Sequence, residues 1–170
     1  MMDEGVRLVR AEVPLIDAAL RGDDALARAL GSPVVPGWVT FPQALEHTRD
    51  HLAAQPDASA CGARFFLAGH PGELVGWGGF KGPPKDGVVE LGYEIAESRR
   101  GRGLATAATR AMLAEAFSTN EVTSAIAHTL PERNASTRVL EKAGFRFDGD
   151  DDEDGEYVWR WRRDRTPSTS

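Results

Sequence analysis

A glycine-rich turn between a predicted strand and a predicted helix has the residue types best suited to chemistry. Its sequence is RGRGLA, from Arg100 to Ala105, and it follows the strand-like residues 88–96. Glycines let the backbone turn tightly and bring N–H groups close to a ligand. The first turn of a helix adds N–H groups without intrahelical partners and a positive dipole end. The turn therefore predicts an anion cradle suited to a pyrophosphate, although such turns also occur without a ligand.

Two arginines and two missing features narrow the kind of anion site. Arg100 and Arg102 can add charge-assisted contacts to a phosphate. The turn lacks the Gly-Lys-Ser/Thr ending of a P-loop. The strand before it belongs to an antiparallel run rather than to a βαβ unit, which also excludes a dinucleotide fingerprint.

The elements that position this turn are predicted from hydrophobic periodicity and turn residues. Helices are expected at 14–30 with an interruption at Gly22, at 40–55 with Thr40 and Gln43 at capping-box spacing, at 104–117 and at 134–144. Strands are expected at 6–13, 64–69, 73–80, 88–96, 123–128, 145–147 and 157–162. This order indicates a mixed α/β (α+β) fold, with a mostly antiparallel sheet of about seven strands flanked by about four helices.

Length and composition fit one compact domain. The 170 residues are 41% hydrophobic and 27% charged, with a formal net charge of -6. This charge argues against a general nucleic-acid-binding protein, which usually has a basic face. No apolar run has the length of a membrane span or signal peptide, so we expect a cytoplasmic protein. We expect a single domain over residues 1–165 and a flexible tail over 166–170.

The cysteine and histidine content argues against a disulfide or a metal site. Cys61 is the single cysteine. His47 and His51 have helical i, i+4 spacing, but no third ligand is evident near them. We therefore expect no bound metal.

The glycine-rich turn and a second segment resemble a known family. RGRGLA is similar to the Gln/Arg-x-x-Gly-x-Gly/Ala motif of the GNAT superfamily of N-acetyltransferases, with Arg100, Gly103 and Ala105 at its fixed positions. ELGYEIAESRRGRGLATAA, residues 90–108, and LPERNASTRVLEKAGF, residues 130–145, resemble the ribosomal-protein N-acetyltransferase branch. The resemblance runs from about Phe65 to Trp161 and has both motifs in the order of the family.

The resemblance implies a single-domain GNAT fold with acetyl-CoA as co-substrate. Coenzyme A would lie in a notch between the strand that ends at Ile95 and the strand that begins near Thr123. Its pantetheine arm would run beside Ile95, Ala96 and Glu97, with Asn134 on the other side. The pyrophosphate would lie beside Arg100 on the N–H groups of Gly101, Arg102, Gly103, Leu104, Ala105 and Thr106.

Acetyl transfer to an amine needs a base and an oxyanion donor. An alkyl amine with a pKa near 10.4 is neutral in only about one molecule in a thousand at pH 7, so a base must take its proton. Glu90 precedes Arg100 by about the interval at which related enzymes hold a glutamate, and it is the expected base; the alternative is a solvated strand carboxylate. By resemblance, the backbone N–H of Ile95 would hold the oxyanion.

The acid for the departing thiolate is an open role. Many members of the superfamily have a tyrosine in the last helix, four residues before a Gly-Phe pair, but this chain has Leu140 there. The ribosomal branch has a serine early in that helix, which Ser136 matches, and its hydroxyl would hydrogen-bond the sulfur of coenzyme A. Asn134 and Ser136 are also both candidates for the N-cap of the helix.

The acceptor amine is expected on the side of the sheet opposite the helix that follows Ala105. Glu90 and Glu94 share one face of their strand and would point to that side if the other face packs under the helix. Trp38 and Trp77 are expected walls of the acceptor groove.

Two aromatic residues and an acidic run near the acceptor side have plainer interpretations. Phe41 and Phe80 are expected in the core. The acidic run, residues 148–156, is expected as a solvated hairpin loop; the alternative is a surface that attracts a cationic acceptor.

These features predict an acetyl-CoA-dependent N-acetyltransferase that acts on a primary amine, in a protein N-terminus or a small molecule, by direct attack in a ternary complex. The alternative is a non-catalytic acyl-CoA-binding sensor or interaction module on the same fold. YVWRWR, residues 157–162, alternates aromatic and charged residues and suggests an edge contact in a homodimer. No nucleic-acid or membrane partner is expected, and the sequence fixes neither the acceptor nor the oligomeric state.

Overall fold

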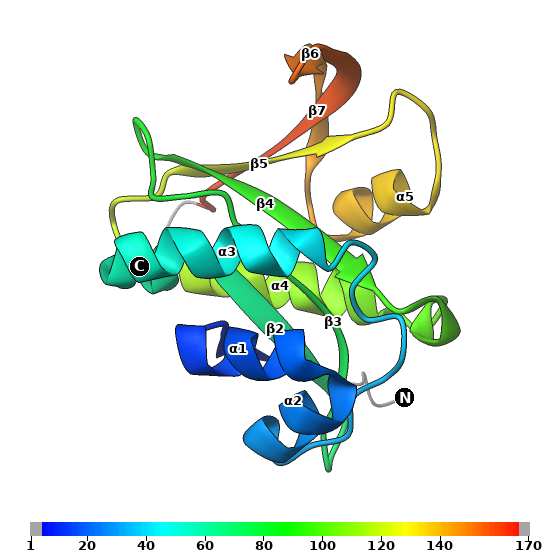
Figure 1. Ribbon diagram of the computed structural model, residues 1–170. Coiled ribbons are helices and arrows are strands. Elements are labelled where there is room, and N and C mark those ends of the chain that lie inside the picture. The colour runs from blue at the N-terminus through cyan, green and yellow to red at the C-terminus, as the bar shows by residue number, and fades with distance from the viewer. Residues whose placement is uncertain (1–4, 167–170) are drawn as a thin grey trace.

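The protein forms one seven-stranded sheet with helices on both faces, as the computed structural model in Figure 1 shows. The structure describes residues 5–166, apart from the side chains of Pro56, Ser59 and Ala60, so the predicted tail at 166–170 lies almost wholly outside it. The strands are β1 (Val6–Arg10), β2 (Ala63–Ala68), β3 (Glu73–Phe80), β4 (Val88–Ile95), β5 (Ser124–Thr129), β6 (Arg146–Glu153) and β7 (Glu156–Asp164). The α-helices are α1 (Val13–Arg21), α2 (Asp23–Leu30), α3 (Gln43–Ala54), α4 (Leu104–Ala116) and α5 (Ala135–Lys142).

The sheet has the order β1-β2-β3-β4-β5-β7-β6, and its one parallel pair is β4 with β5. Helices α1, α2 and α3 pack on one face of the sheet, and α4 and α5 pack on the other. The predicted mixed, mostly antiparallel fold is confirmed. Five α-helices form instead of about four, because Gly22 divides residues 13–30 into α1 and α2 at a positive φ of 130°.

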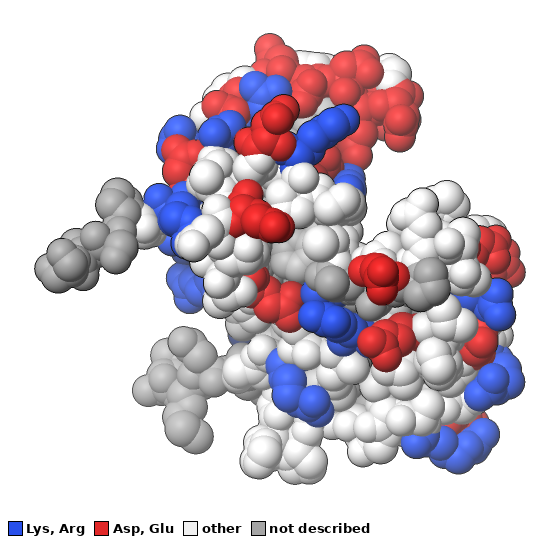
Figure 2. Space-filling model, turned by 90° about the vertical axis from the view of Figure 1, so that its left-hand side faces the viewer, with Lys and Arg blue, Asp and Glu red and all other residues white. Residues whose placement is uncertain are grey.

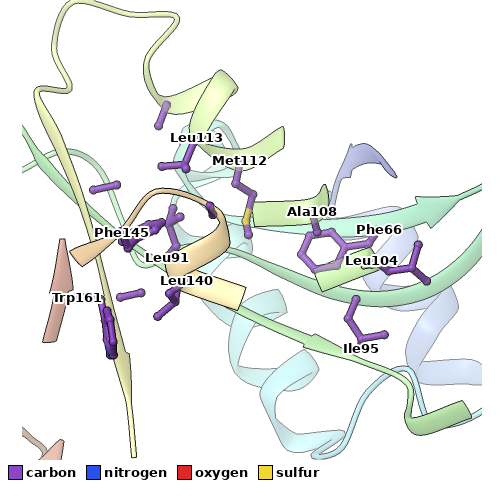
Figure 3. Close-up of a cluster of buried hydrophobic side chains, with 14 of the residues drawn as sticks. Phe66, Leu91, Ile95, Leu104, Ala108, Met112, Leu113, Leu140, Phe145 and Trp161 are labelled. Atoms are coloured by element: carbon purple, nitrogen blue, oxygen red, sulfur yellow. The ribbon is translucent and has the colours of Figure 1, made fainter. Parts of the chain in front are cut away.

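The packing of β4 against α4 fixes the start of that helix relative to the end of the strand. Leu91 and Ile95 lie on the same face of β4 and are buried against α4. Leu104, Ala108 and Met112, spaced four apart along α4, meet them (Figure 3). A helix rich in alanine and leucine suits this position, because these residues combine high helix propensity with apolar side chains that can be buried against the sheet.

The acidic run is a strand rather than the predicted loop. Strand β6 extends to Glu153, and only Asp154 and Gly155 lie between β6 and β7. Arg160 on β7 donates to the carboxylates of Asp148 and Asp151 at 2.9 and 3.2 Å. These cross-strand pairs offset the low strand propensity of aspartate.

Two further expectations about the α3 side are wrong. Thr40 does not cap α3, because Pro42 occupies the N-cap position and makes no side-chain cap. Phe41 is 68% exposed rather than in the core. Phe80 is half-buried and packs against the core.

Glycines on β3 let its backbone approach that of β4 very closely. A Cβ atom added to Gly76 would lie 2.1 Å from the carbonyl oxygen of Glu94. The obstacle is backbone rather than a flexible side chain, so a methyl group there must push the two strands apart.

We predict that Gly76→Ala lowers the free energy of unfolding by about 1–3 kcal/mol, the usual cost of overpacking. Gly92→Ala on the facing strand is the matched control, because its added Cβ meets only Lys81 Cε, at 3.7 Å. Urea denaturation of both variants checks this. Equal stability of the two variants would show that the strands are not held at the distance described.

Candidate functional site

Strands β4 and β5 pair over only part of their length and then part. Their parallel register runs from Val88 opposite Ser124 to Leu91 opposite Ala127. Beyond Leu91, β4 continues to Ile95 on β3 alone, and β5 continues to Thr129 on β7 alone. The backbone of β4 after Leu91 therefore has one side without a strand partner.

One cavity, the smaller of the two described below, lies beside this gap and has a volume of about 500 Å³. Its wall comes from the end of β4, the glycine-rich turn with the start of α4, and one face of α5. These residues are Tyr93, Glu94, Ile95, Arg99, Arg100, Gly101, Gly103, Leu104, Ala105, Thr106, Ala135, Ser136, Arg138, Val139 and Lys142.

The glycine-rich turn has the conformation of an open cradle. Gly101 and Gly103 have φ values of 80° and 78°, which residues other than glycine rarely adopt. No other atom lies within 4 Å of the position where a Cβ would stand on either glycine. Gly103 is the N-cap of α4. The N–H of Ala107 donates a hydrogen bond to the carbonyl oxygen of Gly103. The N–H groups of residues 104–106 precede that bond and are free to bind an anion.

The wall of the smaller cavity is positively charged. Arg99, Arg100, Arg138 and Lys142 lie on it, against one carboxylate, Glu94. Sequence reasoning missed Arg99 as well as Arg138 and Lys142, which lie on α5. Arg138 and Lys142 share one face of α5 with Ala135 and Val139, and this helical spacing is visible in the sequence. It becomes informative only when that face is known to point to the glycine-rich turn.

The larger cavity has a volume of about 1090 Å³ and lies on the α3 face of the sheet. Its wall includes His47, His51 and Leu52 of α3 and Trp77 of β3. Tyr93 and Glu94 line both cavities. The two cavities therefore meet at these two neighbouring residues of β4.

Glu94 is held at this meeting point by three hydrogen bonds. The backbone N–H and hydroxyl of Thr40 donate to Oε1 at 2.9 and 2.6 Å, and the Trp77 indole N–H donates to Oε2 at 3.0 Å. A carboxylate oxygen has two lone pairs, so Oε2 can accept another hydrogen bond. Thr40, which does not cap α3, ties the segment between α2 and α3 to the sheet instead.

Glu90 lies away from both cavity walls, in a charged network. Its Oε2 atom is 2.7 Å from Lys81 Nζ and 2.9 Å from His128 Nδ1. His128 Nε2 in turn contacts Asp151 Oδ2 at 2.9 Å. Burial alone would raise the pKa of Glu90, but the hydrogen bonds from Lys81 and His128 outweigh it and lower that pKa. A lowered pKa makes Glu90 a weaker proton acceptor.

His128 is held between two carboxylates that favour its charged form. Burial lowers its pKa, but the hydrogen bonds to Glu90 and Asp151 outweigh burial, and its pKa is raised. The same contact, with others, lowers the pKa of Asp151 to about 2. The imidazole ring thus joins β4, β5 and β6 through its two nitrogens.

One cluster has the ligand types of a metal site. Among the residues that the structure describes, only Glu90, His128 and Glu153 form such a group, with ligand atoms within 4.8 Å of one another. Lys81 Nζ lies 2.7 Å from both Glu90 Oε2 and Glu153 Oε1. The ammonium group of Lys81 already pairs with both carboxylates of this cluster, so the cluster gives no support for a metal.

The predicted cofactor residues divide between the wall and its surroundings. On the wall of the smaller cavity lie Ile95, Arg100, Gly101, Gly103, Leu104, Ala105, Thr106 and Ser136. Off that wall lie Ala96, Glu97, Arg102 and Asn134. The side chain of Asn134 accepts from Thr137 N–H in a capping box, so Asn134 is the N-cap of α5 and Ser136 is not.

The backbone at Ile95 points into the gap. The N–H of Ala96 donates to the carbonyl oxygen of Val75 on β3 at 2.7 Å. Successive peptide groups of a strand point to opposite sides, so the N–H of Ile95 points away from β3. Arg100 Nε donates to the carbonyl oxygen of Ile95 at 3.1 Å, which agrees with this direction.

One predicted wall residue is in the core instead. Trp38 is 1% exposed, packs edge-on against Phe65 and Trp77, and donates its indole N–H to Asp23 at 3.1 Å. Trp77 does reach the wall of the larger cavity, as expected. Trp38 packs against Trp77 from the core, because the segment between α2 and α3 folds back over the sheet.

A family model for the acetyltransferase (GNAT) domain matches residues 12–146 of the chain. A curated relative from Bacillus subtilis (strain 168), described as the uncharacterized N-acetyltransferase YjdG, is 27% identical over 143 residues, which cover 82% of this chain and 85% of the relative. In residues 5–166, no helix is both long and apolar enough to cross a membrane.

Two solved structures share the fold. AAC(6')-Ib in complex with ribostamycin and coenzyme A is 19% identical, with a TM-score of 0.67 and coverage of 95% of this chain and 94% of that chain. A ribosomal-protein α-N-acetyltransferase, RimL, in complex with coenzyme A is 18% identical, with a TM-score of 0.64 and 94% of each chain covered. The ribosomal branch that the sequence resembles is therefore among the structural neighbours.

The network around His128 makes stability depend on pH in a defined direction. A raised pKa in the folded state stabilises the protein below the unfolded pKa of about 6.5, and this contribution is lost as pH rises through the folded value. We predict that His128→Gln destabilises the protein by about 1 kcal/mol more at about pH 5.5 than at about pH 8.5. Urea denaturation at both pH values measures this.

His47→Gln is the control for this measurement, because His47 is exposed on α3. It should change stability little at either pH. A loss in His128→Gln that is the same at both pH values would mean that folding does not raise the pKa of the ring.

Proposed function

The chain belongs to the GNAT family of acetyltransferases, and we propose that it transfers an acetyl group from acetyl-CoA to a primary amine by direct attack in a ternary complex. The observation that carries this proposal is that two cavities meet at Tyr93 and Glu94. A donor in one cavity and an acceptor in the other would touch there and nowhere else along β4. Direct transfer needs such a meeting point, because it avoids an acetylated protein intermediate.

The residues of the smaller cavity fit the chemical groups of acetyl-CoA. The open cradle at Gly101 and Gly103 would take the pyrophosphate on free N–H groups. Arg100, Arg138 and Lys142 match the negative charge of the phosphates. The unpaired edge of β4 suits the amide groups of the pantetheine arm, and Ser136 lies on the opposite wall. Bound acetyl-CoA supplies the thioester that the amine attacks.

Glu94 is the residue that we assign to the amine. Its carboxylate lies where the cavities meet and retains a free lone pair on Oε2, so it can hold an ammonium group and accept its proton. The neutral amine then attacks the acetyl carbon. The oxyanion that forms can accept a hydrogen bond from the backbone N–H of Ile95. Glu90, the base that the sequence favoured, has a lowered pKa and lies off both walls, so we assign it a positioning role through Lys81 and His128.

The acceptor is either a protein N-terminus or a small-molecule amine. The larger cavity combines an apolar floor at Trp77, Phe80 and Leu52 with the carboxylates of Glu94 and Asp57. This lining suits a single ammonium group on a partly apolar body. RimL is described as an α-N-acetyltransferase of a ribosomal protein, and AAC(6')-Ib was solved in complex with the small molecule ribostamycin. Proteins of this fold thus include examples of both kinds of acceptor.

Calorimetric titration of acetyl-CoA into the purified protein tests the donor site. We expect saturable binding that Gly103→Trp weakens more than tenfold, or by about 1.4 kcal/mol, because the indole fills the cradle. Gly155→Trp is the matched control, since Gly155 also has a positive φ and open space around it but lies in the β6–β7 turn. Undetectable binding by the unchanged protein would refute the donor site.

A panel of primary amines, with release of the coenzyme A thiol as the readout, then tests for transfer. Thiol release that needs an amine supports the acetyltransferase. Binding of acetyl-CoA without thiol release for any amine would favour the non-catalytic sensor.

The assignment of the base is tested by Glu94→Gln beside Glu90→Gln. We predict that Glu94→Gln lowers kcat at least about 100-fold, the usual contribution of a general base. Acetyl-CoA affinity should change less than about threefold, because the side chain keeps its shape and much of its hydrogen bonding. Glu90→Gln should lower kcat by less than about tenfold. The reverse order of the two effects would return the role to Glu90.

A further inference from the structure

The departing sulfur of coenzyme A has no acid at the position that the family resemblance suggests. Leu140 stands where many relatives have a tyrosine, and it is 1% exposed within the core against α4. No side chain can reach a cavity from that position without repacking the core. Stabilisation of the thiolate must therefore come from other residues at the place where the two cavities meet.

Tyr93 is the residue at this place that faces away from Glu94. The two are neighbours on β4, so their side chains lie on opposite faces of the sheet. Glu94 points to α3, and the ring of Tyr93 packs against the core on the α4 side while still lining both cavities. During direct transfer the amine nitrogen and the sulfur are both bonded to the acetyl carbon of the tetrahedral intermediate, so groups that contact them approach from different directions, as the side chains of this pair can.

The hydroxyl group of Tyr93 is available for a ligand. Its partner in the structure is the backbone carbonyl oxygen of Ser136, at 3.5 Å. This distance is at the long limit for a hydrogen bond, where an O–H···O bond normally measures about 2.7 Å. A mostly buried hydroxyl with such a weak partner gains by turning to a stronger acceptor in the cavity.

We propose that the hydroxyl group of Tyr93 donates a hydrogen bond to the sulfur of coenzyme A and stabilises the thiolate as it leaves. This proposal rests on the proposed function and adds a residue to it. Ser136, which lines the same cavity from α5, is the second donor to the sulfur.

The step balances without a further reactant. The oxyanion of the tetrahedral intermediate re-forms the carbonyl double bond, the carbon–sulfur bond breaks, and its electron pair stays on sulfur. The ammonium group loses one proton to Glu94 before the attack, and the nitrogen of the tetrahedral intermediate loses a second proton to water. The thiolate takes up a proton from water on release, and Glu94 gives its proton back to water, so one proton is released overall. Tyr93 keeps its own proton throughout and contributes only the hydrogen bond.

The acidity of Tyr93 agrees with a donor that does not give up its proton. Burial raises the pKa of Tyr93 to about 12, although the contact with Ser136 opposes the rise. An alkyl thiol has a pKa near 8.5, so transfer of the phenol proton to the thiolate would be uphill by roughly three pKa units. A phenol with this acidity stabilises the anion as a hydrogen-bond donor across the physiological range of pH.

The test compares Tyr93→Phe with Tyr157→Phe, since these are the two tyrosines of the chain. Phenylalanine keeps the packed ring of Tyr93 and removes the hydroxyl. Tyr157 is 57% exposed on β7, which makes it the matched control. The first readout is the pKa of the thiol of bound coenzyme A, followed through the ultraviolet absorbance of the thiolate. The second is kcat with the best amine of the panel.

We expect Tyr93→Phe to raise the pKa of the bound thiol by about one unit and to lower kcat about 10- to 100-fold. Tyr157→Phe should leave both unchanged. Affinity for desulfo-coenzyme A, which lacks the sulfur, should be the same in the wild type and Tyr93→Phe, because only the sulfur contact is removed. A structural role for Tyr93 would instead weaken both ligands equally.

The outcomes separate this proposal from the proposed function. If the wild-type protein binds no coenzyme A, the proposed function itself fails. If coenzyme A binds and its thiol has the same pKa in the wild type and Tyr93→Phe, only the role of Tyr93 is refuted. Equal losses of affinity for coenzyme A and desulfo-coenzyme A would also refute it.

Discussion

The parting of β4 from β5 after Leu91 is the constraint on which the rest of the structure depends. A strand in the middle of a sheet normally satisfies its backbone on both sides, and an unpaired buried peptide group is costly. The guanidinium group of Arg100 satisfies the carbonyl oxygen of Ile95 from within the gap. The other groups on this edge remain open to a ligand with amides of its own. The gap therefore leaves backbone groups of β4 without a strand partner and makes room for the smaller cavity.

Packing on either side of β4 keeps this gap open. On one face, Leu91 and Ile95 are fixed by α4, so the strand cannot swing toward β5. At the other edge, Gly76 lets β3 approach closely enough that β4 is held by backbone contacts there. Before the gap, His128 and its carboxylates join β4 to β5 and β6. The strand is thus fixed up to Leu91 by charge and beyond it by packing.

Local patterns in the sequence predicted most of the elements and the glycine-rich turn. Strand β3 and the start of α4 were predicted at their observed positions, because alternation, turn residues and helix propensity are set by neighbours in the chain. The acidic part of β6 after Phe147 was missed because its stability depends on Arg160 and His128, which lie on other strands. The burial of Trp38 was missed for the same reason, since it depends on how the segment before α3 folds over Trp77.

The candidate site shows the same division between local and distant information. The cradle residues and both carboxylates of β4 were identified from the sequence, because each belongs to a short segment with its own pattern. What separates Glu90 from Glu94 is their partners: Lys81 and His128 for the first, Thr40 and Trp77 for the second. These partners come from other strands and from the segment before α3. The alternation of side chains along β4 places both carboxylates on the same face of the strand. Only the tertiary structure gives them different chemistry.

The distribution of charge limits what the acidic run can do for an acceptor. Acidic residues gather over the β6–β7 end of the molecule (Figure 2), yet none of residues 148–156 lines either cavity. Asp148 and Asp151 are already paired with Arg160 and His128, so their charge is largely neutralised. Exposed charges act over about one Debye length, roughly 8 Å at physiological salt. The run can therefore attract a cation toward this end of the molecule, but discrimination between amines must come from the wall around Glu94.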